Sequence, residues 1–147
     1  PKIIANRTTP ASSDLELPAW AVRDAMEGLA GSVGDDLGTG HHLTIDGVRD
    51  PIFNVPGVRV YGKTGTAAAP DLKVQSDDEH DGLGPTAAEV VRSGDHSWFV
   101  VMVGRSNERP KYIISVVMEY SGSGGKVSGP IVNQIVQALK DEGYLGG

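Results

Sequence analysis

Cysteine is absent from this chain of 147 residues, so no disulfide bond can stabilise its fold. No apolar run approaches the roughly 20 residues of a membrane-spanning helix, and no signal peptide is recognisable. We therefore expect these residues neither to export nor to anchor themselves. Positive charge is also scarce, with 13 Lys and Arg against 19 Asp and Glu. The formal charge of −6 argues against nucleic acid or an anionic membrane as a partner.

Residues that bind metals are sparse as well. The best candidate site is the acidic run Asp77-Asp78-Glu79-His80-Asp81, which no cysteine and no helical pair of histidines accompanies. We interpret this run as a solvated loop, and we expect the adjacent His41 and His42 to be loop residues. The sequence therefore predicts neither a metal nor a cofactor.

Residues 58–66, Val-Arg-Val-Tyr-Gly-Lys-Thr-Gly-Thr, carry the most informative pattern in the chain. Alternating β-branched and aromatic residues predict a strand that leads into Lys63. The hydroxyls of Thr64 and Thr66 flank this cation, and the neighbouring glycines let a ligand approach the backbone closely. This combination indicates a strand that binds an anion.

Residues 57–64 also match the phosphate-loop pattern G-x-x-x-x-G-K-[ST] letter for letter. That motif requires a flexible turn and a helix that begins at the lysine. Here the intervening residues favour a strand, and Pro70 would stop a helix within about one turn. We therefore favour the Lys-Thr-Gly element of serine acyl-transfer enzymes that act on penicillin and D-alanyl peptides. A nucleotide-binding loop remains the outside alternative.

Two helices are predicted, over residues 18–33 and about 129–142, and a proline suits the first turn of each. Ser128 is placed to cap the second helix and Gly143 to end it. The apolar faces are expected to comprise Val22, Met26, Leu29 and Val33 in the first helix, and Ile131, Ile135 and Leu139, with Val132 and Val136 beside them, in the second.

Residues 97–104 and 112–119 are nearly continuous apolar runs, which indicate strands covered on both faces. Their short connection predicts an antiparallel hairpin. Residues 35–56 are mixed in character, with a turn expected near Asp46-Gly47, and residues 67–95 are expected to form a long polar loop of functional or mobile character. The sum is one α+β domain over residues 1–147, an antiparallel sheet with packed helices.

Four segments, in their order and spacing, resemble the C-terminal part of the transpeptidase domain of penicillin-binding proteins, most closely those of class B. The resemblance covers nearly the whole chain and implies the C-terminal portion of a serine transpeptidase/β-lactamase-like domain. The segments are Gly38-Thr39-Gly40, Gly62-Lys63-Thr64-Gly65-Thr66-Ala67, His96-Ser97-Trp98-Phe99-Val100 and Gly124-Gly125-Lys126-Val127-Ser128-Gly129-Pro130-Ile131.

The resemblance implies specific roles around Lys63. Its ammonium would lend positive potential to the nucleophile's surroundings and to the terminal carboxylate of the substrate. Thr64 and Thr66 would donate hydroxyls to that carboxylate, and the backbone N–H of Thr66 would be one oxyanion-hole donor. Gly65 would keep the strand surface low, so that the acyl peptide lies against it as an added strand. Trp98 and its neighbour His96 are instead expected to be packing residues.

One departure from the family pattern is decisive. The nucleophile motif Ser-x-x-Lys is absent upstream of Lys63, where the family has it, and so is Ser-x-Asn. The literal match Ser123-Gly124-Gly125-Lys126 lies downstream in a glycine-rich loop, and we interpret it as coincidence. Ser12-Ser13-Asp14 has a related form but lies too close to Lys63. Because the chain begins at Pro1 rather than methionine, we expect the half that carries the nucleophile to lie upstream in the parent protein.

These residues leave it uncertain whether the chain is an enzyme by itself. The resemblance implies that its partners are the N-terminal half of the same domain and a peptidoglycan stem peptide or β-lactam. It also implies a place in the cell envelope outside the cytoplasmic membrane, in a parent anchored through a segment absent from these residues. The alternatives are a β-lactamase, a β-lactam sensor, or a non-catalytic interaction module of the same fold.

Overall fold

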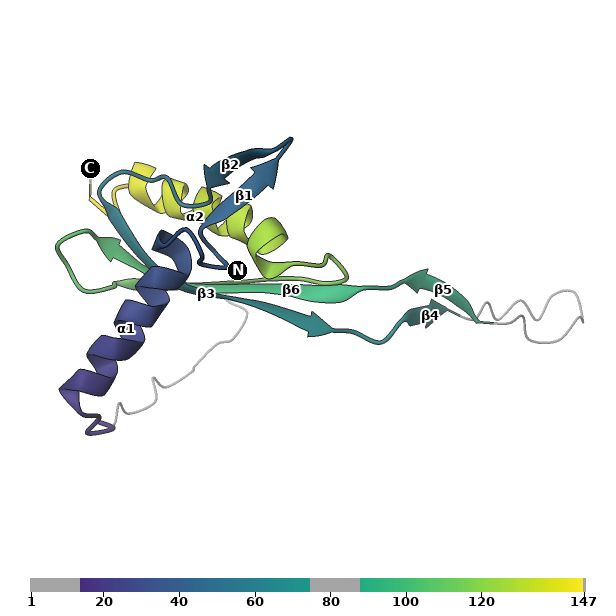
Figure 1. The fold of residues 1–147 in the computed structure, drawn as a ribbon, viewed down its shortest axis with the longest axis horizontal. Coiled ribbons are helices and arrows are strands. Elements are labelled where there is room, and N and C mark those ends of the chain that lie inside the picture. Colours follow the sequence, from purple (N-terminus) through teal and green to yellow (C-terminus); the bar gives the residue numbers. More distant parts are fainter. Residues whose placement is uncertain (1–13, 75–87, 147) are drawn as a thin grey trace, which may run out of the picture.

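The computed structural model describes residues 14–74 and 88–146. Its centre is a three-stranded antiparallel sheet in the order β3-β6-β7, with helices packed against it (Figure 1). The expected α+β class is confirmed. Along the chain the elements are α1 (Ala19–Gly34), β1 (His42–Ile45), β2 (Val48–Pro51), β3 (Val58–Ala68), β4 (Leu72–Val74), β5 (Glu89–Arg92), β6 (Asp95–Arg105), β7 (Tyr112–Met118), the π-helical turn η1 (Gly124–Ser128) and α2 (Gly129–Asp141).

The core lies on one face of this sheet, which we call the inner face. Alternate residues of β6, including Phe99, Val101 and Val103, are almost completely buried there. Helix α2 covers this face through Val132 and Val136, which are fully buried. Burying an aliphatic or aromatic side chain of this size contributes about 1.5–3 kcal/mol, so this small set of residues provides much of the stability.

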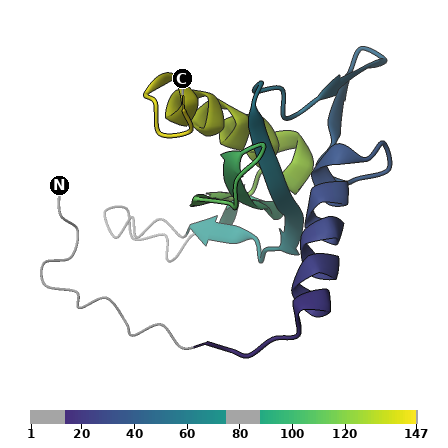
Figure 2. The same ribbon diagram turned by 90° about the vertical axis from the view of Figure 1, so that its left-hand side faces the viewer.

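Helix α1 confirms the first predicted helix and runs beside β3 (Figure 2). It approaches the sheet closely at Gly62, where a Cβ atom would lie 2.9 Å from the side chain of Val33. Val33 is the only buried residue of α1, and Val22, predicted to lie on the buried face, is exposed. The helix therefore packs through its C-terminal end.

The opposite face of the sheet, the outer face, is open in the part of the chain that the structure describes. Several of its apolar residues are solvent-exposed, from about 40% for Trp98 and Val100 to 73% for Ile113, whereas Met102 is half-buried. The expectation that both faces are covered is wrong for these residues, and so is the expectation that Trp98 is buried by packing. The continuous apolar pattern predicts a covering layer that residues 14–74 and 88–146 do not supply.

Residues 35–56 form more regular structure than expected. The predicted turn is present, with positive φ at Asp46 (51°) and Gly47 (81°), and it joins β1 to β2 in a hairpin. His42 therefore lies in a strand, whereas His41 lies in the preceding loop. Each of the two strands has only four residues, and most of them are exposed. The sequence therefore has no alternation of apolar residues that would predict them.

The predicted loop over residues 67–95 is also partly wrong. Strand β3 continues to Ala68, β6 begins at Asp95, and the short strands β4 and β5 pair beyond them in a projecting ribbon (Figure 1). All the residues of β4 and β5 are exposed, so no core pattern marks them in the sequence. The acidic run 77–81 lies outside the described residues, as do Ser12 and Ser13.

The second predicted helix is confirmed as α2, but its first turn differs from the prediction. Ser128 makes no side-chain capping hydrogen bond, because it ends the π-helical turn η1 and its hydroxyl points to β6. The buried face is centred on Val132 and Val136, while Ile135 is 37% exposed. Gly143, with a φ of 79°, follows the helix end as predicted.

Candidate substrate-binding edge

Lys63 lies midway along β3, and β3 continues as a strand for five residues beyond it. No helix begins at Lys63, so the phosphate-loop interpretation is wrong. Within the described residues, β3 pairs only with β6 and leaves its other edge open. Lys63 therefore lies on an exposed edge strand.

The backbone groups that face this open edge follow from the strand register. The amide of Ser106 donates to the carbonyl of Gly57 (3.0 Å), which makes this a hydrogen-bonded pair of the β3–β6 ladder. In an antiparallel ladder, alternate residues direct their N–H and C=O toward the partner strand. Thr64 and Thr66 each lie an odd number of residues after Gly57. Their N–H and C=O groups therefore point away from β6. The N–H of Thr66 points to the open edge.

Side chains of the motif leave β3 in two directions. Paired residues of neighbouring strands place their side chains on the same face of the sheet. Thr64 and Thr66 pair with Phe99 and Ser97, so their side chains lie on the inner face, whereas Lys63 pairs with Val100 and lies on the outer face. The Lys63 ammonium turns back to the edge and donates to the carbonyl oxygen of Thr64 at 2.8 Å. The cation and the two hydroxyls thus approach the same edge from opposite faces.

Both threonine hydroxyls already have a protein partner. The Oγ1 atoms of Thr64 and Thr39 lie 2.7 Å apart, and Thr66 Oγ1 accepts the amide of Gly124 at 3.3 Å. Because the Thr66 hydroxyl accepts this hydrogen bond, its own hydrogen stays available to donate. The arrangement can supply hydroxyl and backbone donors to an anion at the edge.

The glycine-rich turn packs directly on this strand. A Cβ atom on Gly124 would collide with the carbonyl oxygens of Gly65 and Trp98, and one on Gly125 would collide with the carbonyl of Thr39. Gly65 has its own constraint, since a Cβ there would lie 3.2 Å from the Cβ of Trp98. At Gly124 and Gly125 only glycine permits the close backbone approach, whereas at Gly65 a side chain would be tightly packed against Trp98.

A buried pair of serines completes the arrangement. The hydroxyls of Ser97 and Ser128 lie 2.6 Å apart, and neither residue is accessible to solvent. This contact joins β6 to the end of η1. The four segments that carry the family resemblance are therefore brought together around the edge of β3.

The other predicted residues are peripheral to this edge. Half-buried His96 accepts the backbone N–H of Tyr120 through Nδ1 (3.1 Å), so its role in packing is confirmed. Ser123 immediately precedes η1 and Lys126 lies within it, both with exposed side chains. No group of three or more His, Asp or Glu among residues 14–74 and 88–146 could hold a metal ion.

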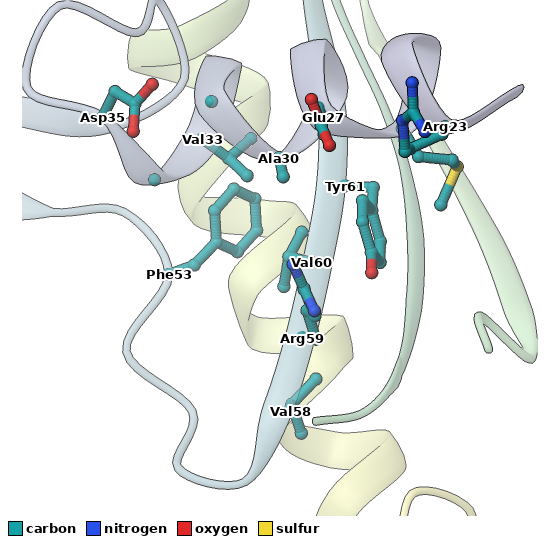
Figure 3. A pocket seen from close by; sticks show the side chains of 13 residues that line it. Arg23, Glu27, Ala30, Val33, Asp35, Phe53, Val58, Arg59, Val60 and Tyr61 are labelled. Carbon is teal, nitrogen blue, oxygen red and sulfur yellow. The ribbon is translucent and has the colours of Figure 1, made fainter. Parts of the chain in front are cut away.

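A separate cleft of about 700 Å³ lies between α1 and the first half of β3 (Figure 3). Its lining includes Arg23, Glu27, Phe53 and Tyr61 but neither Lys63 nor the motif threonines. The charged residues on its rim are of both signs, so it offers no concentrated positive potential to an anion. We therefore place the candidate site at the open edge of β3 and not in this cleft.

A comparison with protein families identifies the family of the chain. The model of the penicillin-binding protein transpeptidase domain matches residues 2–137, nearly the whole chain. The chain belongs to this family. Comparisons with curated proteins and with solved structures gave no match.

Penicillin-binding transpeptidases are part of the peptidoglycan machinery of the cell envelope. Neither of the helices that the structure describes is long and apolar enough to cross a membrane.

The individual roles of Lys63, Thr64, Gly65 and Thr66 stay predictions, now with a defined geometry. Sequence reasoning did not foresee that Thr39 contacts Thr64. The two glycines around Thr39 were the signal, because they indicate close packing at that position.

Proposed function

We propose that this chain forms the substrate-binding wall of a peptidoglycan D,D-transpeptidase of the class B type, and that the nucleophile comes from another segment. One observation carries this proposal. The N–H of Thr66 and the hydroxyls of Thr64 and Thr66 converge with the Lys63 ammonium on an open strand edge. A peptide carboxylate and a developing oxyanion are the anions that such an edge suits.

In this proposal the residues act as binding and electrostatic groups. Lys63 supplies positive potential, and the hydroxyls of Thr64 and Thr66 donate to the carboxylate of a stem peptide or β-lactam. The Thr66 N–H stabilises the oxyanion that forms when the acyl carbonyl is attacked. Gly65 leaves room for the peptide to lie along β3 as an additional strand.

The proposed partner is the N-terminal half of the same transpeptidase domain. Two features of the described residues favour it: the second edge of the sheet, at β7, is unpaired, and the outer face is apolar and open. The outer face includes Trp98, Val100, Ile113 and Val117, and exposing such a surface is unfavourable in water. A covering half that also supplies the serine would account for both features. We further propose that the parent is anchored to the membrane and works on its outer side.

A labelling experiment with a fluorescent penicillin tests the proposal. The chain alone should not be labelled covalently, while the chain combined with the N-terminal half of its parent should be. Replacement of Lys63 by alanine in the combined protein should reduce labelling strongly, because the positive potential at the edge is lost. Covalent labelling of the chain alone would contradict the need for the second half.

The labelling result, combined with further observations, separates the alternatives. A stable acyl-enzyme indicates a transpeptidase or a β-lactam sensor, and cell-wall crosslinking then distinguishes these two. Rapid turnover of a chromogenic cephalosporin would indicate a β-lactamase. A parent without an upstream Ser-x-x-Lys would indicate a non-catalytic module.

A further inference from the structure

Thr39 lies in the loop after α1, 25 positions before Thr64, and their hydroxyl oxygens are 2.7 Å apart. We propose that Thr39 is a positioning residue that orients the hydroxyl of Thr64 toward the substrate carboxylate. This inference rests on the proposed function, because it assigns a role within the same binding edge.

The backbone around Thr39 is held firmly. The amide of Gly40 donates to the carbonyl of Ser32 (2.9 Å), and that of Gly38 donates to the carbonyl of Asp35 (2.8 Å). A Cβ atom on Gly38 would collide with carbonyls of α1, and one on Gly40 would lie 2.6 Å from the ring of Phe99. The loop is thus fixed to the end of α1 on both sides of Thr39, so its hydroxyl is presented from a rigid support.

The orientation of Thr64 is restricted from two sides. Its methyl group faces Gly125, where a Cβ atom would lie 3.6 Å from the methyl carbon. Its hydroxyl faces Thr39. Because a β-branched side chain has few favourable rotamers, these two contacts select one of them. The same Gly125 packs against the carbonyl of Thr39, so the three residues form one connected unit.

The number of hydrogens on the two hydroxyls determines the direction of the hydrogen bonds between Thr39, Thr64 and a bound anion. Each hydroxyl has one hydrogen to donate and two lone pairs to accept. When an anion occupies the edge, Thr64 donates to the anion and Thr39 donates to Thr64. Such a chain polarises the terminal hydroxyl and strengthens its bond to the anion. Thr39 then acts on the substrate through Thr64 without touching it.

The alternative is that the contact only holds the fold together. Both hydroxyls lie in an exposed environment. A hydrogen bond of this kind contributes about 0.5–1.5 kcal/mol to stability, and less where water can replace the partner. Backbone hydrogen bonds and glycine packing already fix the loop. The structural contribution of the side-chain contact is therefore small, and a role in positioning explains it better.

The test uses the complete domain, with the N-terminal half present, and two variants of Thr39. Thr39→Val keeps the shape and removes the hydroxyl, whereas Thr39→Ser keeps the hydroxyl. Loss of one hydrogen bond to a charged network should lower the second-order rate of acylation by a penicillin about 5- to 20-fold in Thr39→Val. Most of this loss should be in binding. Thr39→Ser should retain a rate within about twofold of the unmodified domain.

A second readout distinguishes positioning from a purely structural effect. The unmodified domain should prefer a free penicillin acid to its methyl ester, and Thr39→Val should reduce that preference. In a Thr64→Val background, adding Thr39→Val should cost nothing further, because the two residues act through one hydroxyl.

The outcomes separate this inference from the proposed function. If the complete domain is not acylated, the proposed function itself is wrong. If Thr64→Val acylates normally, Thr64 does not bind the carboxylate, and the role of Thr39 is overturned with it. If Thr64→Val is impaired while Thr39→Val keeps both the rate and the preference for the acid, only the role of Thr39 is overturned. A melting temperature lowered equally in Thr39→Val and Thr39→Ser, with equally reduced rates, would assign Thr39 to the fold alone.

Discussion

The hydroxyls of Ser97 and Ser128 form a buried hydrogen bond of 2.6 Å across 31 positions of sequence. Each hydroxyl also reaches a backbone carbonyl: Ser97 contacts the carbonyl of Ser123, and Ser128 contacts that of Ser97, both at 3.2 Å. The pair therefore fixes the π-helical turn η1 to β6. Through η1 it also sets the position of Gly124 on the binding edge.

Replacing either serine of this pair by alanine should destabilise the chain by about 0.5–1.5 kcal/mol, because the buried bond between the two hydroxyls is lost while the remaining hydroxyl still donates to a backbone carbonyl. The double variant Ser97→Ala/Ser128→Ala should cost less than the sum of the two single changes, since they remove one shared bond. Urea titration of the free energy of unfolding measures both. Ser106→Ala, in the exposed turn between β6 and β7, is the matched control and should change stability little. Additive effects of Ser97→Ala and Ser128→Ala would show that the two hydroxyls do not interact.

Gly124→Ala tests the contact between η1 and β3. The new methyl group would collide with the carbonyl oxygens of Gly65 and Trp98, so the turn must move away from the edge. We expect a loss of about 2 kcal/mol or more, together with a loss of acylation in the complete domain. Gly28→Ala is the control, because nothing lies within 4 Å of a Cβ atom there and alanine favours a helix over glycine by about 1 kcal/mol. A Gly124→Ala variant as stable and active as the parent would show that the close packing is not required.

Thr66→Pro tests the backbone donor. Its N–H faces the open edge, so proline there removes a potential oxyanion donor without removing a β3–β6 ladder bond. Loss of one such donor typically lowers the rate about 10²- to 10³-fold. Thr66→Ala, which lacks the hydroxyl but keeps the N–H, should lose much less. Acylation rates of the two variants in the complete domain decide the matter, and equal rates would exclude the N–H of Thr66 from the oxyanion hole.

The helices and the hairpin could be predicted from the sequence because their apolar residues recur with the period of the element. Helix α1 and strands β6 and β7 lie within one or two residues of the predicted ends. Lys63 could also be assigned to a strand, since β-branched residues precede it and a proline follows. The apolar pattern was sufficient because at least one face of each of these elements is buried, and burial there requires apolar residues.

The rest could not be predicted, for physical reasons that differ by site. Strands β4 and β5 are exposed throughout, so no side-chain pattern separates them from a loop. Ser128 has the identity and position of a helix cap, but its tertiary bond to Ser97 prevails over that local preference. The contact of Thr39 with Thr64 depends on how α1 ends against β3, which no short stretch of sequence encodes.

The outer face gives a final prediction about the proposed N-terminal partner. Ile113 lies near the start of the edge strand β7, opposite Met102 in the register, and is 73% exposed on this face. Ile113→Asp should change the stability of the chain alone by less than about 0.5 kcal/mol, because an exposed side chain loses little. If the partner half covers this face, the buried carboxylate would be strongly unfavourable there, and the yield of penicillin-labelled complex should fall at least about tenfold. Val48→Asp, at a 59% exposed position in the β1–β2 hairpin, is the matched control and should reconstitute normally. Equal yields from the two variants would show that the partner leaves the outer face uncovered, and the apolar run in β7 would then need another explanation.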